Sequence, residues 1–281
     1  MELTGARVLV AGATGVLGGL AARALAERGA RVALAGRNPV RLAALARDLG
    51  GCPARSFEAC DLDQCSALGP WATRVLAGLD GVLVTVGTAG FGAVEDVSNE
   101  VAGHLLTVNA LCPMAILRGA SSLVSDKGFL LAVTGAVADR PRAGAAVEHA
   151  APGLRTARAP APALGTGTGT GTDRTTPSRA RTTPSTDRAD SMMGRDNART
   201  DIASYLAGTA DYTASKAALS SWLGVLAAEL APRAVTVLDI RAPRLETGAT
   251  GRRAPGRPPA LPNEAAALDA ARALLDRITS A

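Results

Sequence analysis

The chain is 281 residues long and 47 % hydrophobic, so it can bury a full core, and we expect one domain spanning residues 1–281. Its net charge of +5 comes from one segment, because residues 140–200 hold ten arginines against five acids and the remainder is balanced at 20 basic and 20 acidic residues. The sequence has no apolar run of about 18 residues and no secretory signal pattern, which argues against a membrane span and against export and predicts a soluble, cytoplasmic protein. It also has no CxxC pair, which argues against a zinc site and a disulfide framework.

Short apolar strands alternate with helices along the chain. The predicted strands are residues 6–12, 31–36, 81–87, 128–135 and 234–240. The predicted helices are residues 16–29, 39–50, 100–121, 212–231 and 263–281. Strands that are apolar on both faces and separated by helices are typical of a parallel sheet covered on both sides. We therefore predict a doubly wound α/β fold.

The first strand runs into the glycine-rich turn "AGATGVLGG", whose glycines are spaced G-x-x-G-x-x-G between a strand and a helix. Glycine lets the backbone turn tightly and approach a pyrophosphate, whose charge is stabilised by the free N–H groups of a helix N-terminus. A structural turn would explain the glycines as well, but their position after the first strand favours dinucleotide binding. The cofactor-binding residues predicted here are Gly12, Thr14, Gly15, Val16, Leu17 and Gly18.

The end of the second strand distinguishes the two nicotinamide cofactors. An acid there would bind the adenosine ribose hydroxyls and repel a 2′-phosphate, but "ALAGRNPVR" has none and offers Arg37, whose planar fork pairs well with phosphate. A solvent-facing arginine is the alternative. We predict that NADP(H) is preferred, with NAD(H) as the second choice. We also expect Asp61 near the adenine ring, and Leu62 and Gly87 in contact with the cofactor.

Residues 143–200 contain "GTGTGTGT" and "DRTTPSRARTTPSTDRAD" and almost no large apolar side chains. Such a segment cannot offset the entropy of ordering, so we predict a low-complexity, disordered insertion within the domain. An arginine-rich arm that binds RNA or acidic surfaces is the alternative, but arms of that kind are usually denser in charge and often carry aromatic residues. We therefore expect a solvated loop and no nucleic-acid partner.

The stretch "DYTASKAALS" contains one of only two lysines in the chain, Lys127 and Lys216, although Lys and Arg together number 30. Tyr212 and Lys216 are four residues apart in a predicted helix, so their side chains project from one face. A tyrosine that transfers a proton near neutral pH needs its pKa of about 10 lowered, and a neighbouring ammonium does this by stabilising the phenolate. The pair therefore predicts a tyrosine acid/base tuned by an amine.

The order of "GATGVLG", "LLTVNALCP", "YTASKAAL" and "IRAPRLET" resembles that of the short-chain dehydrogenase/reductases, over all of the chain except the insertion. The resemblance implies a Rossmann-type, three-layer α/β/α fold and hydride transfer between NAD(P)(H) and a carbonyl or secondary alcohol. It implies that Tyr212 is the general acid/base, that Lys216 tunes it and holds the nicotinamide ribose, and that Asn109 holds a water of the proton relay. Pro243 and Thr247 would lie beside the nicotinamide, and the chain would form a homodimer or homotetramer.

Three features depart from the family pattern. The glycine spacing is that of the extended and atypical branches, and "TVGT" at residues 85–88 replaces the usual Asn-Asn-Ala-Gly. In "AVTGAVAD", Gly135 stands at the position of the family's serine, and Thr134, one residue earlier, is the candidate to supply the missing hydroxyl. Removing such a donor costs about 10²- to 10³-fold in rate in other enzymes.

These departures keep two alternatives open. The first is a dinucleotide-binding sensor or regulator with weak catalysis, and the second is an epimerase or dehydratase of the extended branch, for which the C-terminal region leaves little room. His104 and His149 have no partner at metal-ligand spacing, so we predict no metal site. The leading prediction is an NADP(H)-preferring oxidoreductase of small carbonyl or alcohol substrates.

Overall fold

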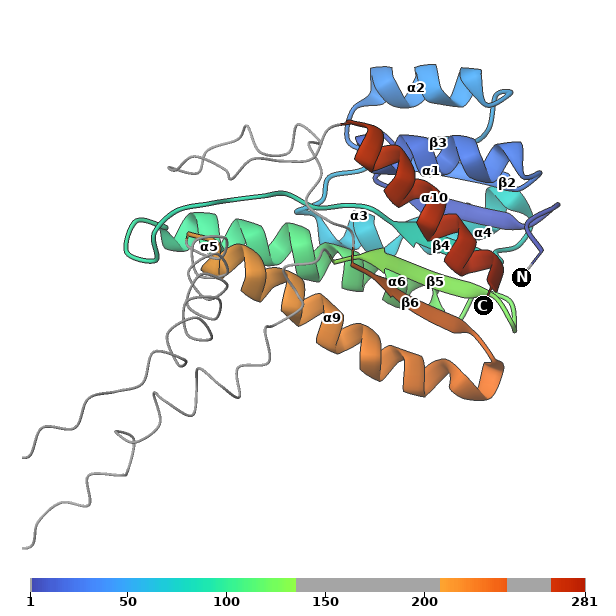
Figure 1. Ribbon diagram of the computed structural model, residues 1–281. Coiled ribbons are helices and arrows are strands. Elements are labelled where there is room, and N and C mark those ends of the chain that lie inside the picture. Colours follow the sequence, from blue (N-terminus) through green and yellow to red (C-terminus); the bar gives the residue numbers. More distant parts are fainter. Residues whose placement is uncertain (1, 135–207, 242–263, 281) are drawn as a thin grey trace, which may run out of the picture. The chain divides into compact units, whose positions relative to one another are not determined.

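Six strands form one parallel sheet in the order β3-β2-β1-β4-β5-β6 (Figure 1). Their bounds are β1 Arg7–Ala11, β2 Arg31–Gly36, β3 Ala54–Ser56, β4 Gly81–Val84, β5 Phe129–Val133 and β6 Thr236–Ile240. The chain leaves β1 in one direction to reach β3 and then returns past β1 to build β4, β5 and β6. This reversal places a topological switch point between β1 and β4, and it confirms the predicted doubly wound fold.

The computed structural model describes residues 2–134, 208–241 and 264–280. All of them belong to one compact unit, Met1–Asp139 with Tyr205–Ala281. The insertion predicted over residues 143–200 lies outside the described residues, as do Gly135, Pro243 and Thr247. The assignment of residues 1–281 to a single domain stays a prediction.

The long predicted helices are present, and their ends differ from the predicted ones by no more than two residues. The helices after β1, β2 and β5 and at the C-terminus are α1 Val16–Glu27, α2 Pro39–Asp48, α9 Ala210–Leu230 and α10 Glu264–Ser280. The helices α3 Leu62–Ser66 and α4 Leu68–Leu76 were not predicted from the sequence. Both are short, and α4 contains a glycine and a proline, which weaken the helical pattern.

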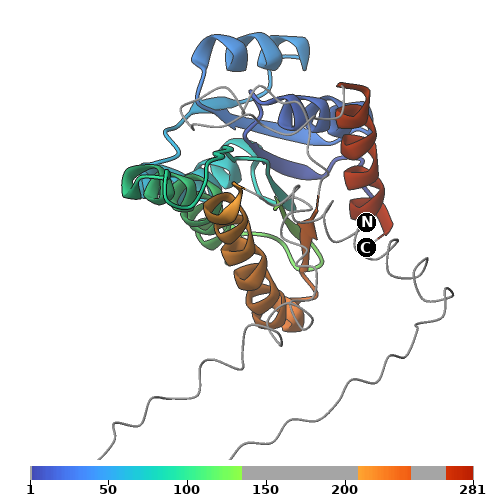
Figure 2. The same ribbon diagram turned by 60° about the vertical axis from the view of Figure 1, so that its left-hand side comes forward.

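Side chains that alternate along the strands separate two apolar cores. In β1, Leu9 and Ala11 face a core built with α4, α6 Cys112–Ser121 and α9, whereas Val8 and Val10 face a core built with α1, α2 and α10. Figure 2 shows α9 and α10 on opposite sides of the strands. Burial of both strand faces explains the continuous apolar runs in the sequence.

The predicted helix over residues 100–121 is a continuous helical segment with a change of winding in its middle. It consists of α5 Asn99–Leu106, a π-helical turn η1 at Thr107–Leu111, and α6. By length and composition Asn99–Ser121 could cross a membrane, but half of its most apolar window is buried in this protein. Its buried apolar residues belong to the core, and η1 turns Asn109 inward, where its side chain is fully buried.

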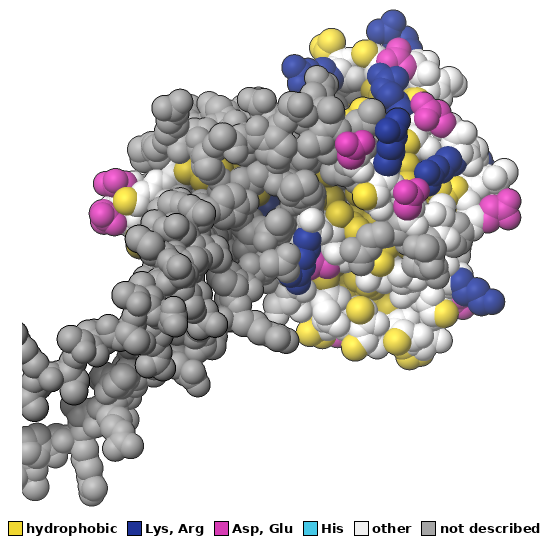
Figure 3. Space-filling model, viewed as in Figure 1, with side chains coloured by type: hydrophobic (Ala, Val, Ile, Leu, Met, Phe, Trp, Pro, Cys, Tyr) yellow, Lys and Arg dark blue, Asp and Glu magenta, His cyan; other side chains and the backbone are white. Residues whose placement is uncertain are grey.

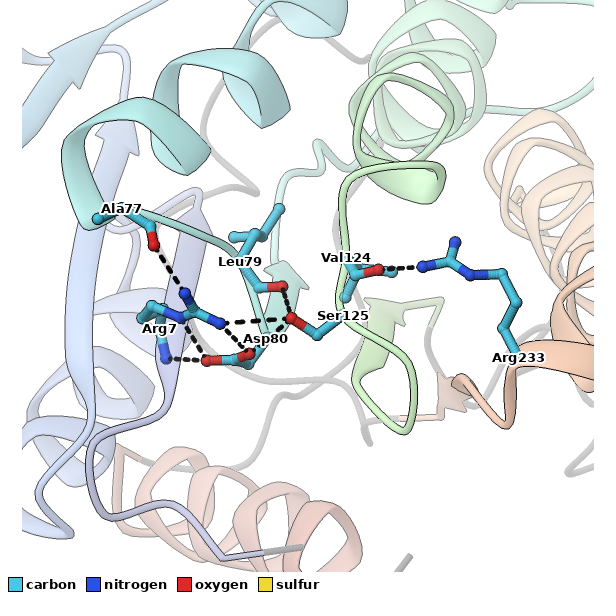
Figure 4. Close-up of polar contacts among 7 residues, drawn as sticks. All are labelled: Arg7, Ala77, Leu79, Asp80, Val124, Ser125 and Arg233. Atoms are coloured by element: carbon cyan, nitrogen blue, oxygen red, sulfur yellow. Dashed lines mark hydrogen bonds and ion pairs between the residues drawn. The ribbon is translucent and has the colours of Figure 1, made fainter.

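An ion pair fixes the amino-terminal edge of the sheet, opposite the switch point. Arg7 at the start of β1 donates to both carboxylate oxygens of Asp80, which precedes β4, and Ser125 also donates to Asp80 (Figure 4). These bonds hold the pKa of Asp80 at about 2, chiefly through the Arg7 side chain. Arg233, after α9, donates to the backbone carbonyl of Val124. This edge is thus held by guanidinium groups.

On the part of the surface that is described, basic and acidic side chains are interspersed in the view of Figure 3. This agrees with the balanced charge of the chain outside residues 140–200.

Candidate active site

The turn after β1 requires glycine at two positions, Gly12 and Gly18. Gly12 has φ +93°, and its N–H donates to the carbonyl of Ala35 at the end of β2. A Cβ atom on Gly18 would lie 2.2 Å from the Gly12 oxygen, so α1 packs directly onto the turn. The two glycines therefore allow the helix to start against the strand end.

The N-terminus of α1 is open at the carboxyl edge of the sheet. Gly15 is the N-cap residue, and no side chain caps the helix there. Thr14 lies against Gly36, because a Cβ atom on Gly36 would be 2.8 Å from the Thr14 methyl carbon. Val16 is partly exposed and Leu17 is buried in the protein. The start of α1 therefore has no side-chain cap, and free N–H groups at a helix start are of the kind that bind anions.

A second group of predicted residues lies beyond β2 and β3. Arg37 is exposed directly after β2, and its charge acts on Cys60. Partial burial raises the pKa of the Cys60 thiol, Glu58 adds to this, and Arg37 opposes it. Asp61 caps α3 by accepting hydrogen bonds from the backbone and side chain of Gln64, which lower the pKa of its carboxyl. Leu62 is 37 % exposed.

Lys216 is buried in the middle of the described site, although it is a lysine. It is only 5 % exposed, and its Nζ lies 3.4 Å from the carbonyl oxygen of Val133 at the end of β5. Burial lowers the pKa of Lys216 to about 8, while the charge of Asp239 acts to raise it. A Cβ atom on Gly87 would be 2.9 Å from this Nζ, so glycine leaves room for the ammonium after β4.

Asn109 joins the segment after β4 to α9. Its Oδ1 accepts a hydrogen bond of 2.8 Å from the Thr88 N–H, and its Nδ2 donates to the Thr88 carbonyl at 2.9 Å and to the Ser215 hydroxyl at 3.0 Å. Ser215 in turn donates to the carbonyl of Tyr212 at 2.7 Å. A Cβ atom on Gly87 would lie 3.2 Å from the Asn109 Oδ1, so Asn109 and Lys216 flank the same glycine.

Tyr212 occupies the first turn of α9, which begins at Ala210. It is partly buried, and its ring packs at a tilt on that of Phe91, with the ring centroids 5.9 Å apart. Tyr212 and Lys216 are one helical turn apart, as the sequence spacing predicted.

Thr134 is fully buried at the end of β5. Its backbone N–H donates to the Ile240 carbonyl at 3.0 Å, and its hydroxyl donates to the Asp239 carboxylate on β6. Its role as a replacement for the family's serine stays a prediction.

The structure thus brings Gly87, Asn109 and Lys216 together at the carboxyl ends of the central strands. Tyr212 lies one turn from Lys216 on α9. Sequence reasoning missed Ser215, Phe91 and Asp239, which hold these groups. A signal for Asp239 existed, since it is an acid within the otherwise apolar strand "TVLDI". Among the described residues, no group of three His, Cys, Asp or Glu side chains could hold a metal ion.

Comparison with known proteins finds relatives over part of the chain. Residues 12–153 match a family model described as enoyl-(acyl carrier protein) reductase. Over 128 residues the chain is 34 % identical to an uncharacterized oxidoreductase of Mycobacterium tuberculosis. This match covers 43 % of this chain and 46 % of the relative. Over 91 residues it is 42 % identical to nodulation protein G of Rhizobium meliloti, covering 32 % and 36 %. The match therefore spans less than half the length of these curated relatives.

Solved structures resemble the chain over nearly its whole length. A short-chain dehydrogenase from Burkholderia cenocepacia, in complex with NADP, superposes with a TM-score of 0.67 at 18 % identity, covering 99 % of this chain and 92 % of the other. An alcohol dehydrogenase from Thermococcus sibiricus, complexed with 5-hydroxy-NADP, gives 0.64 at 17 % identity, covering 96 % and 89 %. At these identities the likeness establishes the fold.

Proposed function

The chain belongs to the short-chain dehydrogenase/reductase family, and on that premise we propose that it is an NADP(H)-preferring oxidoreductase that interconverts a small carbonyl compound and its alcohol. The observation that carries the proposal is the convergence of Lys216 and Asn109 on Gly87, with Tyr212 one turn from Lys216. A buried ammonium one helical turn from a tyrosine is an arrangement suited to proton transfer.

The residues of the glycine turn fit a dinucleotide. A Cβ atom on Gly12 would lie 2.5 Å from the Thr85 hydroxyl oxygen, and one on Gly18 would strike the Gly12 carbonyl, so larger residues would push the turn and α1 away from the strand ends. Gly12, Thr14, Gly15 and Gly18, with the uncapped N-terminus of α1, would hold the pyrophosphate. Arg37 would pair with a 2′-phosphate, and Asp61, Leu62 and Gly87 would contact the rest of the cofactor, with Pro243 and Thr247 as further proposed contacts.

A bound nicotinamide supplies or accepts the hydride in this proposal. Tyr212 donates its phenolic proton to the substrate oxygen during reduction and takes it back during oxidation. Lys216 stabilises the phenolate form and holds the nicotinamide ribose, and Asn109 fixes the segment around Thr88 against α9. Thr134 is the proposed donor in place of the family's serine.

The test of the proposed activity is nicotinamide absorbance measured with NADPH and NADH against a panel of aldehydes and ketones. Wild-type turnover should favour NADPH, and Tyr212→Phe should reduce kcat by about 10²-fold or more while cofactor binding persists. Tyr205→Phe changes the other tyrosine of the chain and serves as the matched control. Wild-type turnover that Tyr212→Phe leaves intact would contradict the proposal.

Cofactor preference is tested at Arg37. Arg37→Ala should lower kcat/KM for NADPH by about tenfold and leave that for NADH nearly unchanged, because only NADPH carries the 2′-phosphate. Arg31→Ala alters an exposed arginine at the other end of β2 and should change neither value. An equal loss with both cofactors would argue against a phosphate-binding role.

The second candidate function is a dinucleotide-binding sensor with weak catalysis. The hydrogen bond from the Thr134 hydroxyl to Asp239 favours it, because that hydrogen is then directed away from a substrate. Tight NADPH binding in a calorimetric titration, combined with wild-type turnover no faster than that of Tyr212→Phe, would support the sensor.

We propose a homodimer or homotetramer in the cytoplasm, assembled through α9 and the α5–α6 segment. Leu106, Leu111 and Val225, which lie on these elements, are 43 %, 45 % and 59 % exposed and support such an interface. Sedimentation equilibrium tests it, and a monomer at micromolar concentration would contradict it.

A further inference from the structure

Asp239 is an acid in the middle of the site that no step of the proposed reaction uses. It lies on β6, and its carboxylate accepts hydrogen bonds from the Thr134 hydroxyl through Oδ1 and from the Ser220 hydroxyl at 2.5 Å through Oδ2. Arg241 Nε lies 3.6 Å from Oδ2. The Asp239 side chain is only 20 % exposed. These donors therefore replace hydrogen bonds to water that the carboxylate loses on burial.

The helix that carries the tyrosine also faces this carboxylate. Lys216 and Ser220 are four residues apart on α9 and therefore project from the same face. Ser220 reaches Asp239 directly, and the Lys216 Nζ lies 3.4 Å from the carbonyl of Val133, the residue before Thr134. Asp239 is thus hydrogen-bonded to Thr134, which follows Val133, and to Ser220, which lies one turn after Lys216.

A lysine that is 5 % exposed needs a counter-charge to remain an ammonium. Asp239 is the described acid whose charge acts on Lys216 and raises its pKa, against the larger effect of burial. The other described ionisable side chains on α9, on the elements packed against it and just after β6 are Tyr212, Asp211, Glu229, Glu100, His104, Cys112, Arg118, Arg233 and Arg241. Glu100, His104, Arg118 and Glu229 are exposed, and Arg233 pairs with Asp126.

We propose that Asp239, held by the Thr134 and Ser220 hydroxyls, is a positioning residue of this site whose carboxylate supplies the counter-charge that keeps Lys216 protonated. The proposal rests on the function proposed for Lys216 above. The same carboxylate extends the pH range over which the ammonium can stabilise a tyrosine phenolate.

The test uses the fact that the chain contains only two lysines, Lys127 and Lys216. In a Lys127→Arg background, lysine labelled with ¹³C at the ε carbon gives one resonance, whose chemical shift reports the protonation of Lys216. We expect Asp239→Asn to move its titration midpoint to lower pH by about 1 unit, the lower end of the effect of a nearby opposite charge. Asp126→Asn, which removes an exposed acid paired with Arg233, is the matched control and should leave the midpoint unchanged.

Ser220→Ala separates charge from hydrogen bonding. It removes a bond to Asp239 but keeps the carboxylate, so the Lys216 midpoint should stay near the wild-type value. An unchanged midpoint in Asp239→Asn, or equal shifts in Asp239→Asn and Asp126→Asn, would overturn the proposal. Because the readout is the ammonium itself, a wild type without turnover would count against the proposed function alone.

A second measurement applies if Asp239→Asn fails to fold. The proposal then expects Lys216→Met to restore folding in the double variant, because the buried charge left without its partner is gone. A double variant that remains unfolded, while Lys216→Met alone folds, would show that Asp239 acts through packing and would overturn the proposal.

Discussion

Asn109 and Ser215 are 106 residues apart in the sequence, and a hydrogen bond of 3.0 Å from the Asn109 Nδ2 to the Ser215 Oγ joins them in the core. Together with the two bonds to Thr88, it ties the segment after β4 to the helix that carries Tyr212 and Lys216. The position of the tyrosine helix therefore depends on a buried amide.

Asn109→Ala should lower the free energy of unfolding by about 3 kcal/mol, because the buried Thr88 N–H and carbonyl and the Ser215 hydroxyl lose a partner. Urea denaturation measures the loss. Asn99→Ala, at the exposed first residue of α5, is the control and should change stability by less than about 0.5 kcal/mol. Equal losses in the two variants would mean that the buried amide is not a structural tie.

Lys216 should make stability depend on pH in the alkaline range. Its pKa is about 8 in the folded protein against 10.5 ordinarily, so between these values the unfolded chain binds more protons and stability rises with pH. The free energy of unfolding of the wild type should rise by about 3 kcal/mol relative to Lys216→Met as pH goes from 8 to 10.5. Parallel urea titrations across this range check it. A constant difference would show that Lys216 keeps its ordinary pKa.

Two helical glycines should respond oppositely to alanine. Gly18→Ala places a Cβ 2.2 Å from the Gly12 oxygen and should destabilise the protein by about 3 kcal/mol and abolish dinucleotide binding. Gly224→Ala, on α9 with no atom within 4 Å of the new Cβ, should stabilise it by about 1 kcal/mol. Thermal unfolding and a cofactor titration of both variants measure these effects. Tolerance of alanine at Gly18 would mean that the turn has no need for close packing.

The Arg7–Asp80 pair should contribute to acid sensitivity. Because the pKa of Asp80 is lowered to about 2 from 3.8, its contribution is full above about pH 4 and is lost as pH falls toward 2. Both side chains are partly exposed, so Asp80→Asn should cost only about 1 kcal/mol at neutral pH, and the difference from wild type should shrink toward pH 2. Denaturation at several pH values measures this difference. Asp48→Asn, in the more exposed pair with Arg23, is the control and should lower the free energy of unfolding by less. A loss of stability in Asp80→Asn that does not change with pH would rule out the ion pair as its cause.

Local patterns in the sequence determined the fold class and much of the candidate site. Strands apolar on both faces require helices on both sides, and the glycine spacing after β1 requires a tight turn, so the sheet and the turn were predictable. The four-residue spacing of Tyr212 and Lys216 places them on one helix face without knowledge of the rest of the fold. The short α3 and α4 were missed because a single turn or two carries little periodic signal.

Only the tertiary structure decided how distant groups meet. The π-helical turn that buries Asn109, the contact of Gly87 with Lys216, and the bonds from Thr134 and Ser220 to Asp239 each join segments that no local pattern connects. The pKa of a side chain in water says little about its pKa in a core, since the pKa of Lys216 on α9 is set by burial and by an acid on β6. The sequence therefore determined which chemical groups the protein carries, and the packing of α9 against β5 and β6 decided which of them act on one another.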